Sequence, residues 1–220
     1  MADKKQLELR AFKFDIRAED SESGKIITGR PIVYNSRTDL GWFDEIIEQG
    51  ALDKTDLTDV RFLVNHDTSK IPLARSRRNT PNSTMQLQTD AEGMAIRVNL
   101  DTENNAEASS LYSAVQRGDI TGMSFMFGID GESWEDLESD HPLRRITSIS
   151  TVVEVSAVTF PAYSATSIEV NERSKEALDN ARLAVETARS SADDKRSVDT
   201  DLELAKAKFE FIRKLGGINL

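Results

Sequence analysis

Short alternations of apolar and polar residues run through the first 170 positions and predict β-strands. Val60, Phe62 and Val64, for example, fall on one face of such a strand. Comparable patterns predict strands over residues 6–15, 25–34, 85–89, 94–100, 120–129 and 145–160. Residues 130–142, between the last two strands, are acidic and are expected to form a turn.

One segment in this region has a helical period instead. A helix is expected from about Thr102 to Arg117, with Leu111 and Val115 on its apolar face, Asp101 as its N-cap and Gly118 as its stop. Because strands do not alternate regularly with helices, the order of elements favours an antiparallel sheet or a small barrel over a doubly wound α/β fold.

The pattern changes between Pro161 and Asn171. All five prolines and nine of the eleven glycines precede residue 171, and turn-forming residues of this kind separate short strands. Alanines then recur at helical spacing from residue 177 to 188, and apolar residues step by three and four from residue 198 to 212. The sequence therefore predicts a domain over residues 1–170 and a helical C-terminal extension over residues 171–220.

Charge is divided in the same way. The chain has 28 basic and 38 acidic residues, for a net charge of −10, and the last fifty positions hold ten of each sign. Residues 1–170 thus carry the whole negative charge, which argues against general binding of nucleic acid. No apolar stretch approaches the ~20 residues that span a bilayer, and the N-terminal residues do not resemble a secretory signal. A soluble cytoplasmic protein without a membrane partner is expected.

The absence of cysteine excludes disulfides, a thiol nucleophile and thiolate metal sites. Only two histidines remain as candidates for a general base. His66 ends an apolar strand and shares the parity of Phe62 and Val64, whereas His141 lies in the acidic turn and is expected to be solvated. The structural alternative for His66 is a strand-end side chain that bonds a backbone carbonyl.

Ser124 lies in the middle of an apolar strand, where a hydroxyl needs a partner or a purpose. Gly122 shares its strand face and leaves room beside the hydroxyl. Met126 stands where a Gly-x-Ser-x-Gly elbow would have its last glycine, so an α/β-hydrolase is not indicated. The alternative is a small strand residue whose hydroxyl bonds a neighbouring backbone group.

Glu154 is the only ionisable residue in an apolar run from residue 151 to 161. An unpaired buried carboxylate is costly, so a buried Glu154 needs a charged or strongly donating partner, and a histidine would serve. The alternative is an edge strand that turns Glu154 toward solvent. Together, the chain supplies one serine, one base and one acid on strands, which is the set that nucleophilic catalysis by serine requires.

Three segments carry a family resemblance: Val64-Asn-His-Asp67, Gly118-Asp-Ile-Thr-Gly-Met-Ser-Phe-Met-Phe127 and Glu154-Val-Ser-Ala-Val-Thr-Phe-Pro-Ala162. In this order they resemble the prohead (procapsid maturation) serine proteases of tailed bacteriophages, distant relatives of the herpesvirus assemblins. Residues 29–34 and 48–52 are similar to the opening strands and loop of that family. The resemblance spans about residues 8–170.

The resemblance implies an α+β, mainly β fold: a compact, mostly antiparallel β-barrel with surrounding helices. It implies that His66 is the general base, Ser124 the nucleophile and Glu154 the orienting acid, with Asp67 as a rival for the third role. Assemblin-like enzymes have a second histidine where this chain has Glu154. No cofactor or metal is implied.

The resemblance also implies a function and a place of action. The expected activity is a serine endopeptidase that cleaves the major capsid or scaffold protein, and itself, inside the assembling prohead in the bacterial host cytoplasm. The helical extension would dock on capsid or scaffold helices, self-associate, be removed by self-cleavage, or pack on the barrel. The alternatives are a catalytically inactive scaffold or capsid-assembly protein on the same fold, and a small-molecule esterase that uses the same three residues.

Overall fold

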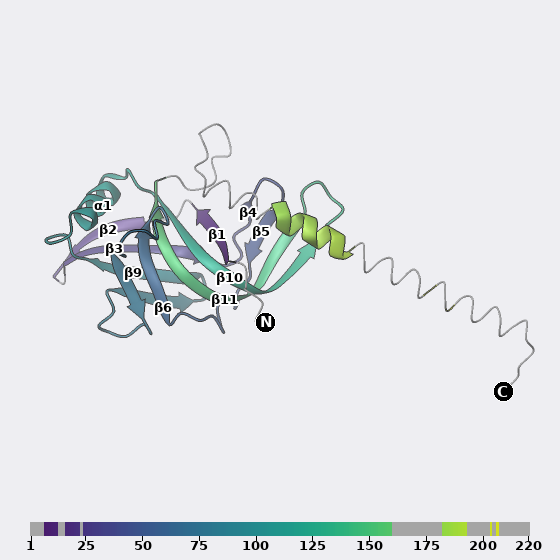
Figure 1. Ribbon diagram of the computed structural model, residues 1–220, viewed down its shortest axis with the longest axis horizontal. Coiled ribbons are helices and arrows are strands. Elements are labelled where there is room, and N and C mark those ends of the chain that lie inside the picture. Colours follow the sequence, from purple (N-terminus) through teal and green to yellow (C-terminus); the bar gives the residue numbers. More distant parts are fainter. Residues whose placement is uncertain are drawn as a thin grey trace, which may run out of the picture.

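The computed structural model describes residues 7–12, 16–22, 24–159 and 182–192, together with residues 203 and 206. Figure 1 shows strands crossing the body, with one helix at one end and a helical stretch at the other. The strands are β1 Leu7–Phe12, β2 Ile16–Ser21, β3 Gly24–Val33, β4 Thr38–Asp39, β5 Asp44–Ile47, β6 Asp59–Val64, β7 Ala74–Arg77, β8 Met85–Asp90, β9 Gly93–Leu100, β10 Gly122–Glu135 and β11 Leu143–Val158.

These strands form two sheets. The first has seven strands, in which β1-β10-β11-β5-β4 form a path and β6 joins β11 to β7; the second has four strands in the order β2-β3-β9-β8. Most neighbours are antiparallel as expected, but β11 pairs in parallel with both β5 and β6. The fold is therefore mainly β.

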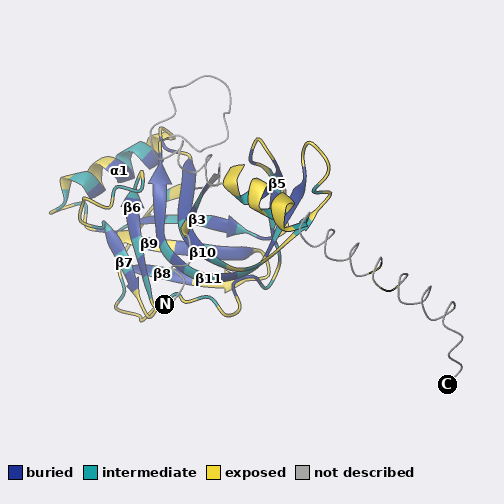
Figure 2. Cartoon of the chain, turned by 45° about the vertical axis from the view of Figure 1, so that its right-hand side comes forward, coloured by how far each residue is buried: buried dark blue, intermediate teal, exposed yellow. Residues whose placement is uncertain are grey.

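The expected closed barrel is not formed by the described strands. β1 pairs with β10 alone, and the four-stranded sheet has its own ladder, so the hydrogen bonds do not run in a ring. What joins the sheets is one apolar core with members from both, such as Ile27 and Met94 from one sheet and Phe125 and Val155 from the other. In Figure 2, long parts of β3, β9, β10 and β11 are coloured as buried. Each large side chain buried in it contributes about 1.5–3 kcal/mol.

The β10–β11 hairpin is longer than the sequence predicts. β10 continues to Glu135 and β11 starts at Leu143, so part of the acidic segment that was expected to be a turn is strand. The reason lies across the ladder, where the carboxylate of Glu135 accepts a hydrogen bond of 2.6 Å from Arg145 Nε. Cross-strand pairs of opposite charge stabilise such an exposed hairpin.

The single helix of the body, α1 Ala106–Arg117, begins four residues later than predicted. Asn105 is its N-cap, with a side chain that accepts from the N–H groups of Glu107 and Ala108. The expected cap, Asp101, instead accepts from the N–H of Asn104 and closes the preceding turn. The stop is as predicted, because Gly118 adopts φ +78°.

Residues 182–192 are helical and pack against the body. Val185 is buried in a small cluster with Leu40 and Phe43, and Arg189 donates to the backbone carbonyls of Leu137 and Ser139 at 3.0 and 2.7 Å. The alanine pattern from residue 177 to 188 and the apolar pattern from residue 198 to 212, which were expected to form the tail helices, lie mostly outside the described residues. The predicted domain boundary lies outside them as well. Within the described chain, no helix is both long and apolar enough to cross a bilayer.

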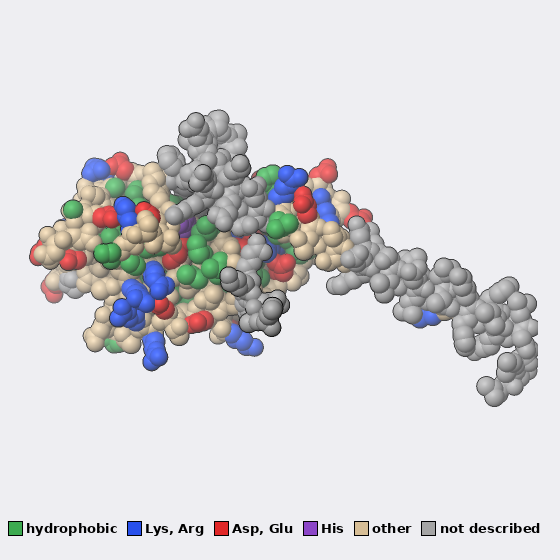
Figure 3. Space-filling view, viewed as in Figure 1, with side chains coloured by type: hydrophobic (Ala, Val, Ile, Leu, Met, Phe, Trp, Pro, Cys, Tyr) green, Lys and Arg blue, Asp and Glu red, His purple; other side chains and the backbone are tan. Residues whose placement is uncertain are grey.

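The surface in Figure 3 is uneven in charge. Basic side chains gather toward the end of the body that is remote from residues 182–192, while hydrophobic side chains appear near the middle of this face. The described chain therefore displays a local concentration of positive charge despite the overall charge of −10.

Candidate active site

His66 lies in a left-handed turn directly after β6. Asn65 and His66 have φ values of +51° and +58°, a conformation that is uncommon outside glycine but several-fold enriched for asparagine and histidine. Three contacts fasten the turn to β11 and the residue that follows it. The Asn65 N–H donates to the carbonyl of Ala157 at 2.9 Å, and the Asn65 side chain exchanges two hydrogen bonds with Thr159. The turn therefore takes His66 out of the strand and sets its ring against β11.

Glu154 meets that ring. Its Oε1 lies 2.5 Å from His66 Nδ1, although the two residues are 88 positions apart in the sequence. The carboxylate is nearly inaccessible, with the side chain 2% exposed, and the histidine side chain is 11% exposed. β11 is an interior strand with β10 and β6 on its two sides, so the alternative of a solvent-facing edge strand is wrong. The partner that a buried Glu154 needs is a histidine.

This contact orients the imidazole. An ionised carboxylate can only accept hydrogen bonds, so Nδ1 of a neutral His66 carries the hydrogen. Nε2 then keeps a lone pair that can take a proton from a nucleophile. The pair thus has the orientation that a general base requires.

Ser124 lies on the neighbouring strand, on the same face of the sheet. It stands directly opposite Ser156 of β11, and Met126 stands opposite Glu154. Side chains of directly opposed residues share a face, so Ser124 and Glu154 both project from the side that carries the site. The Ser124 side chain is fully buried.

The Ser124 hydroxyl donates to the backbone carbonyl of Arg10 in β1, at 2.7 Å. A hydroxyl has one hydrogen, and here that hydrogen points to β1. The structure therefore brings His66 and Glu154 into direct contact and places Ser124 one strand away with its hydrogen bonded elsewhere. A backbone bond of this kind is what the structural alternative for Ser124 predicted.

The rival acid, Asp67, has a different contact. Its Oδ1 accepts from the N–H and the hydroxyl of Ser69, at 3.1 and 2.5 Å, in the manner of a turn-closing aspartate. The second histidine, His141, is remote from the site and lies 3.1 Å from Asp44 through Nε2. With Asp39 they form a group of potential metal ligands, at the surface among acidic side chains.

Ser156 belongs to the site and was not singled out in the sequence. Its hydroxyl donates to Glu154 Oε2 at 2.6 Å and accepts from the His66 N–H at 3.1 Å. The signal was present, because Ser156 follows Glu154 by two positions in a predicted strand and must share its face. A small hydroxyl residue is common on strands, and the spacing alone does not say which group it bonds.

A pocket of about 250 Å³ opens beside Glu154 and Met126. Leu63 and Pro72 give it an apolar wall, and Lys70 lies at the same pocket. A larger pocket, of about 420 Å³, lies against the four-stranded sheet and contains none of the site residues. Of these two pockets, the one beside Glu154 is the one that adjoins the His66–Glu154 pair.

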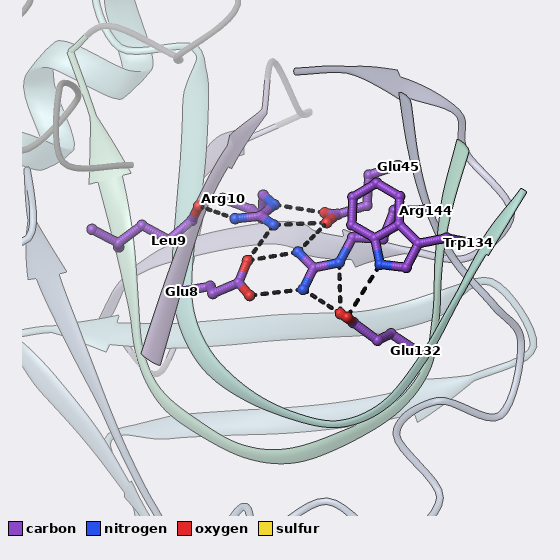
Figure 4. A network of polar contacts seen from close by, with 7 residues as sticks. All are labelled: Glu8, Leu9, Arg10, Glu45, Glu132, Trp134 and Arg144. Atoms are coloured by element: carbon purple, nitrogen blue, oxygen red, sulfur yellow. Dashed lines mark hydrogen bonds and ion pairs between the residues drawn. The ribbon is translucent and has the colours of Figure 1, made fainter. Parts of the chain in front are cut away.

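A buried ionic network holds β1 beside β10, where the Arg10 carbonyl accepts the hydrogen bond of Ser124. Figure 4 shows Arg10 and Arg144 interleaved with Glu8, Glu45 and Glu132. Arg10 Nε lies 2.6 Å from Glu45, and Arg144 Nη1 lies 2.8 Å from Glu8. Burial alone would raise the pKa of Glu8, but the charge of Arg10 and the hydrogen bond and charge of Arg144 outweigh it and lower that pKa to about 2.

The chain was also compared with known protein families and solved structures. The family model of the Caudovirus prohead serine proteases matches residues 12–181. Among solved structures, the chain is similar to the capsid assembly protease gp21 of bacteriophage T4, with a TM-score of 0.41 and 12% identity over 71% of this chain and 98% of that one. No curated protein matches the sequence.

Proposed function

Because the chain belongs to the Caudovirus prohead serine protease family, we propose that it is a serine endopeptidase with Ser124 as nucleophile, His66 as general base and Glu154 as orienting acid. Its substrates are the major capsid or scaffold protein of the prohead and the chain itself, inside the assembling particle. The observation that carries the proposal is the 2.5 Å contact of the buried Glu154 with His66 Nδ1. A buried carboxylate that fixes an imidazole in this way is the device by which serine proteases prepare their base.

The chemistry then follows in two halves. The Ser124 hydroxyl turns from the Arg10 carbonyl, its oxygen attacks the scissile carbonyl carbon, and His66 Nε2 takes the hydroxyl proton. The carbon–nitrogen bond breaks as His66 returns that proton to the leaving amine, and an ester to Ser124 remains. Water, deprotonated by His66, hydrolyses the ester and restores the serine. Glu154 stays ionised throughout and stabilises the imidazolium.

The helical extension, residues 171–220, is proposed to attach the protease to its assembly partners or to be removed by self-cleavage. The contacts of Val185 and Arg189 with the body supply a fixed orientation for at least residues 182–192. This role does not depend on the chemistry of the site.

The test of the function is a comparison of two serine variants. The protein and its Ser124→Ala variant are each produced with the major capsid protein of the same phage, and both chains are weighed by mass spectrometry. Ser133→Ala is the matched control, because Ser133 is an exposed serine of the same strand. Cleavage by the wild type and the control, with none by Ser124→Ala, is expected.

Three results would contradict the proposal. Equal cleavage by Ser124→Ala would remove Ser124 from the chemistry. Intact chains with the wild type would favour the inactive assembly protein, and hydrolysis of activated esters without any cleavage of capsid protein would favour the esterase.

A further inference from the structure

The hydroxyl of Ser156 bonds both members of the His66–Glu154 pair. It donates its hydrogen to Glu154 Oε2 at 2.6 Å and accepts from the backbone N–H of His66 at 3.1 Å. The residue is completely buried, and Glu154 is 1% exposed. Both bonds to the Ser156 hydroxyl are therefore largely shielded from bulk water.

The two bonds fix different parts of the pair. Glu154 binds the imidazole through Oε1, so a second bond at Oε2 stops the carboxylate from rotating about its terminal torsion, which is otherwise broad. The bond from the His66 N–H holds the backbone at φ +58°, from which the ring projects. One hydroxyl thus sets the acid and the base relative to each other.

The fold of the turn does not depend on Ser156 alone. Asn65 still bonds Ala157 and exchanges two hydrogen bonds with Thr159 when the Ser156 hydroxyl is removed. Loss of that hydroxyl is therefore expected to loosen the pair and to leave the turn in place.

Ser156 also stands directly across the ladder from Ser124, so the site contains two buried serines with different partners. The hydrogen of Ser156 is bonded to a carboxylate, in a charge-assisted bond that is stronger than a bond to a neutral carbonyl. The hydrogen of Ser124 is bonded to the Arg10 carbonyl. Of the two, Ser124 is the hydroxyl that can be released at the lower cost.

From these contacts we propose that Ser156 is a positioning residue, which holds the carboxylate of Glu154 and the backbone of His66 in the arrangement needed for proton transfer. The inference rests on the proposed function, since it assigns Ser156 to the same site. The role of Ser156 differs from the roles of Ser124, His66 and Glu154, because Ser156 never bonds the substrate or the reacting atoms.

The experiment compares Ser156→Ala with Ser156→Thr and with Ser76→Ala. Threonine keeps the hydroxyl. Ser76 is a fully buried serine of β7 whose hydroxyl has no hydrogen-bond partner among the described residues, so Ser76→Ala removes a buried oxygen without breaking a bond. Cleavage of the capsid protein gives kcat and KM, and the proton NMR spectrum gives the downfield signal of the His66 Nδ1–H.

Ser156→Ala is expected to lower kcat by about 10–100-fold with little change in KM, as loss of a group that orients a functional residue does elsewhere. The downfield signal should broaden or move. Ser156→Thr should restore kcat and the signal, and Ser76→Ala should leave both unchanged. Wild-type kcat and an unchanged signal in Ser156→Ala would overturn the proposal.

Two further outcomes are assigned in advance. If Ser156→Ala does not fold, Ser156→Cys keeps the volume with a much weaker donor, and wild-type values in that variant overturn the proposal equally. If Ser124→Ala cleaves like the wild type, the proposed function fails; the NMR signal then still decides whether Ser156 orders the pair, because it needs no turnover.

Discussion

At the scale of single residues, the site depends on a backbone conformation as much as on side chains. His66 reaches Glu154 because two successive residues adopt positive φ after β6, and each such residue costs of order 1–3 kcal/mol that its surroundings must offset. Asn65 supplies much of that offset through its bonds to Ala157 and Thr159. The residues around His66 therefore form a turn, and this turn is what places the imidazole against Glu154.

The acid of the pair gives the sharpest test at this scale. Glu154→Gln should lower the rate of capsid cleavage by about 10³–10⁴-fold, because an amide in place of the carboxylate favours the wrong tautomer of the imidazole. Asp67→Asn is the matched control and should cleave at close to the wild-type rate, since the Asp67 carboxylate bonds Ser69. The rates are measured on purified proteins with equal thermal stability. The reverse order of the two variants would assign the third role to Asp67.

The sequence indicated that a buried Glu154 could pair with a histidine, but it did not indicate the groups around this pair. That a buried Glu154 needs a partner, and that a histidine would serve, follows from the cost of an unpaired carboxylate. That the hydroxyl of Ser156 joins them, and that the hydrogen of Ser124 goes to Arg10, depends on contacts between segments 90 and 114 residues apart. Alternation along one strand carries no information about such contacts.

At the scale of elements, β5 is a strand that the sequence did not predict because its burial depends on charge. β5 contains Glu45, which is 2% exposed and reads as a surface residue in the sequence. It is buried because Arg10 and Arg144 neutralise it from β1 and β11. β10 and β11 are long and apolar, so their sequences alone predicted them. Only their ends differ from the prediction.

The ionic network should therefore dominate the stability of this part of the sheet. Arg144→Leu should lower the free energy of unfolding by about 3–5 kcal/mol, because it leaves buried carboxylates with one arginine fewer. Arg145→Leu, at the next position, removes a more exposed pair with Glu135 and should cost less than about 1 kcal/mol. Urea unfolding of both variants provides the measurement. Equal losses would mean that the buried network adds no more than a surface ion pair.

The network also predicts how stability changes in acid. The unfolded chain protonates Glu8 near its ordinary pKa of 4.5, whereas the folded chain does so only at about 2. The contribution is therefore present above pH 4.5 and is lost as pH falls from there toward 2. Glu8→Gln should reduce the slope of stability against pH in this window. The exposed Glu103→Gln should keep the wild-type slope, and an unchanged slope in Glu8→Gln would remove Glu8 as its source.

At the scale of the whole molecule, the described part of the C-terminal extension and the site occupy different regions of one framework. Val185 packs on Leu40 and Phe43. In the described structure, none of these three residues is bonded to His66 or Glu154. Val185→Asp should therefore release residues 182–192 to limited proteolysis while purified enzyme still cleaves capsid protein. Leu183→Asp, at a position that is 52% exposed, should remain protected. Similar proteolysis of both variants would show that this helical stretch is not held by Val185.

The β10–β11 hairpin sets the distance between the site and residues 182–192. Glu154 and Ser124 lie toward one end of the hairpin. At the other end, Arg189 donates hydrogen bonds to the carbonyls of Leu137 and Ser139 in the hairpin loop. From Glu154 back to Leu143 is eleven strand residues, a contour of at most about 40 Å at 3.3–3.4 Å per residue. If the protein were attached to a partner through residues 182–192, its site would therefore lie at a short and fixed distance from the point of attachment. In that case, the peptides that the protein could reach would be those within that distance of the point of attachment, and this distance would limit its substrates.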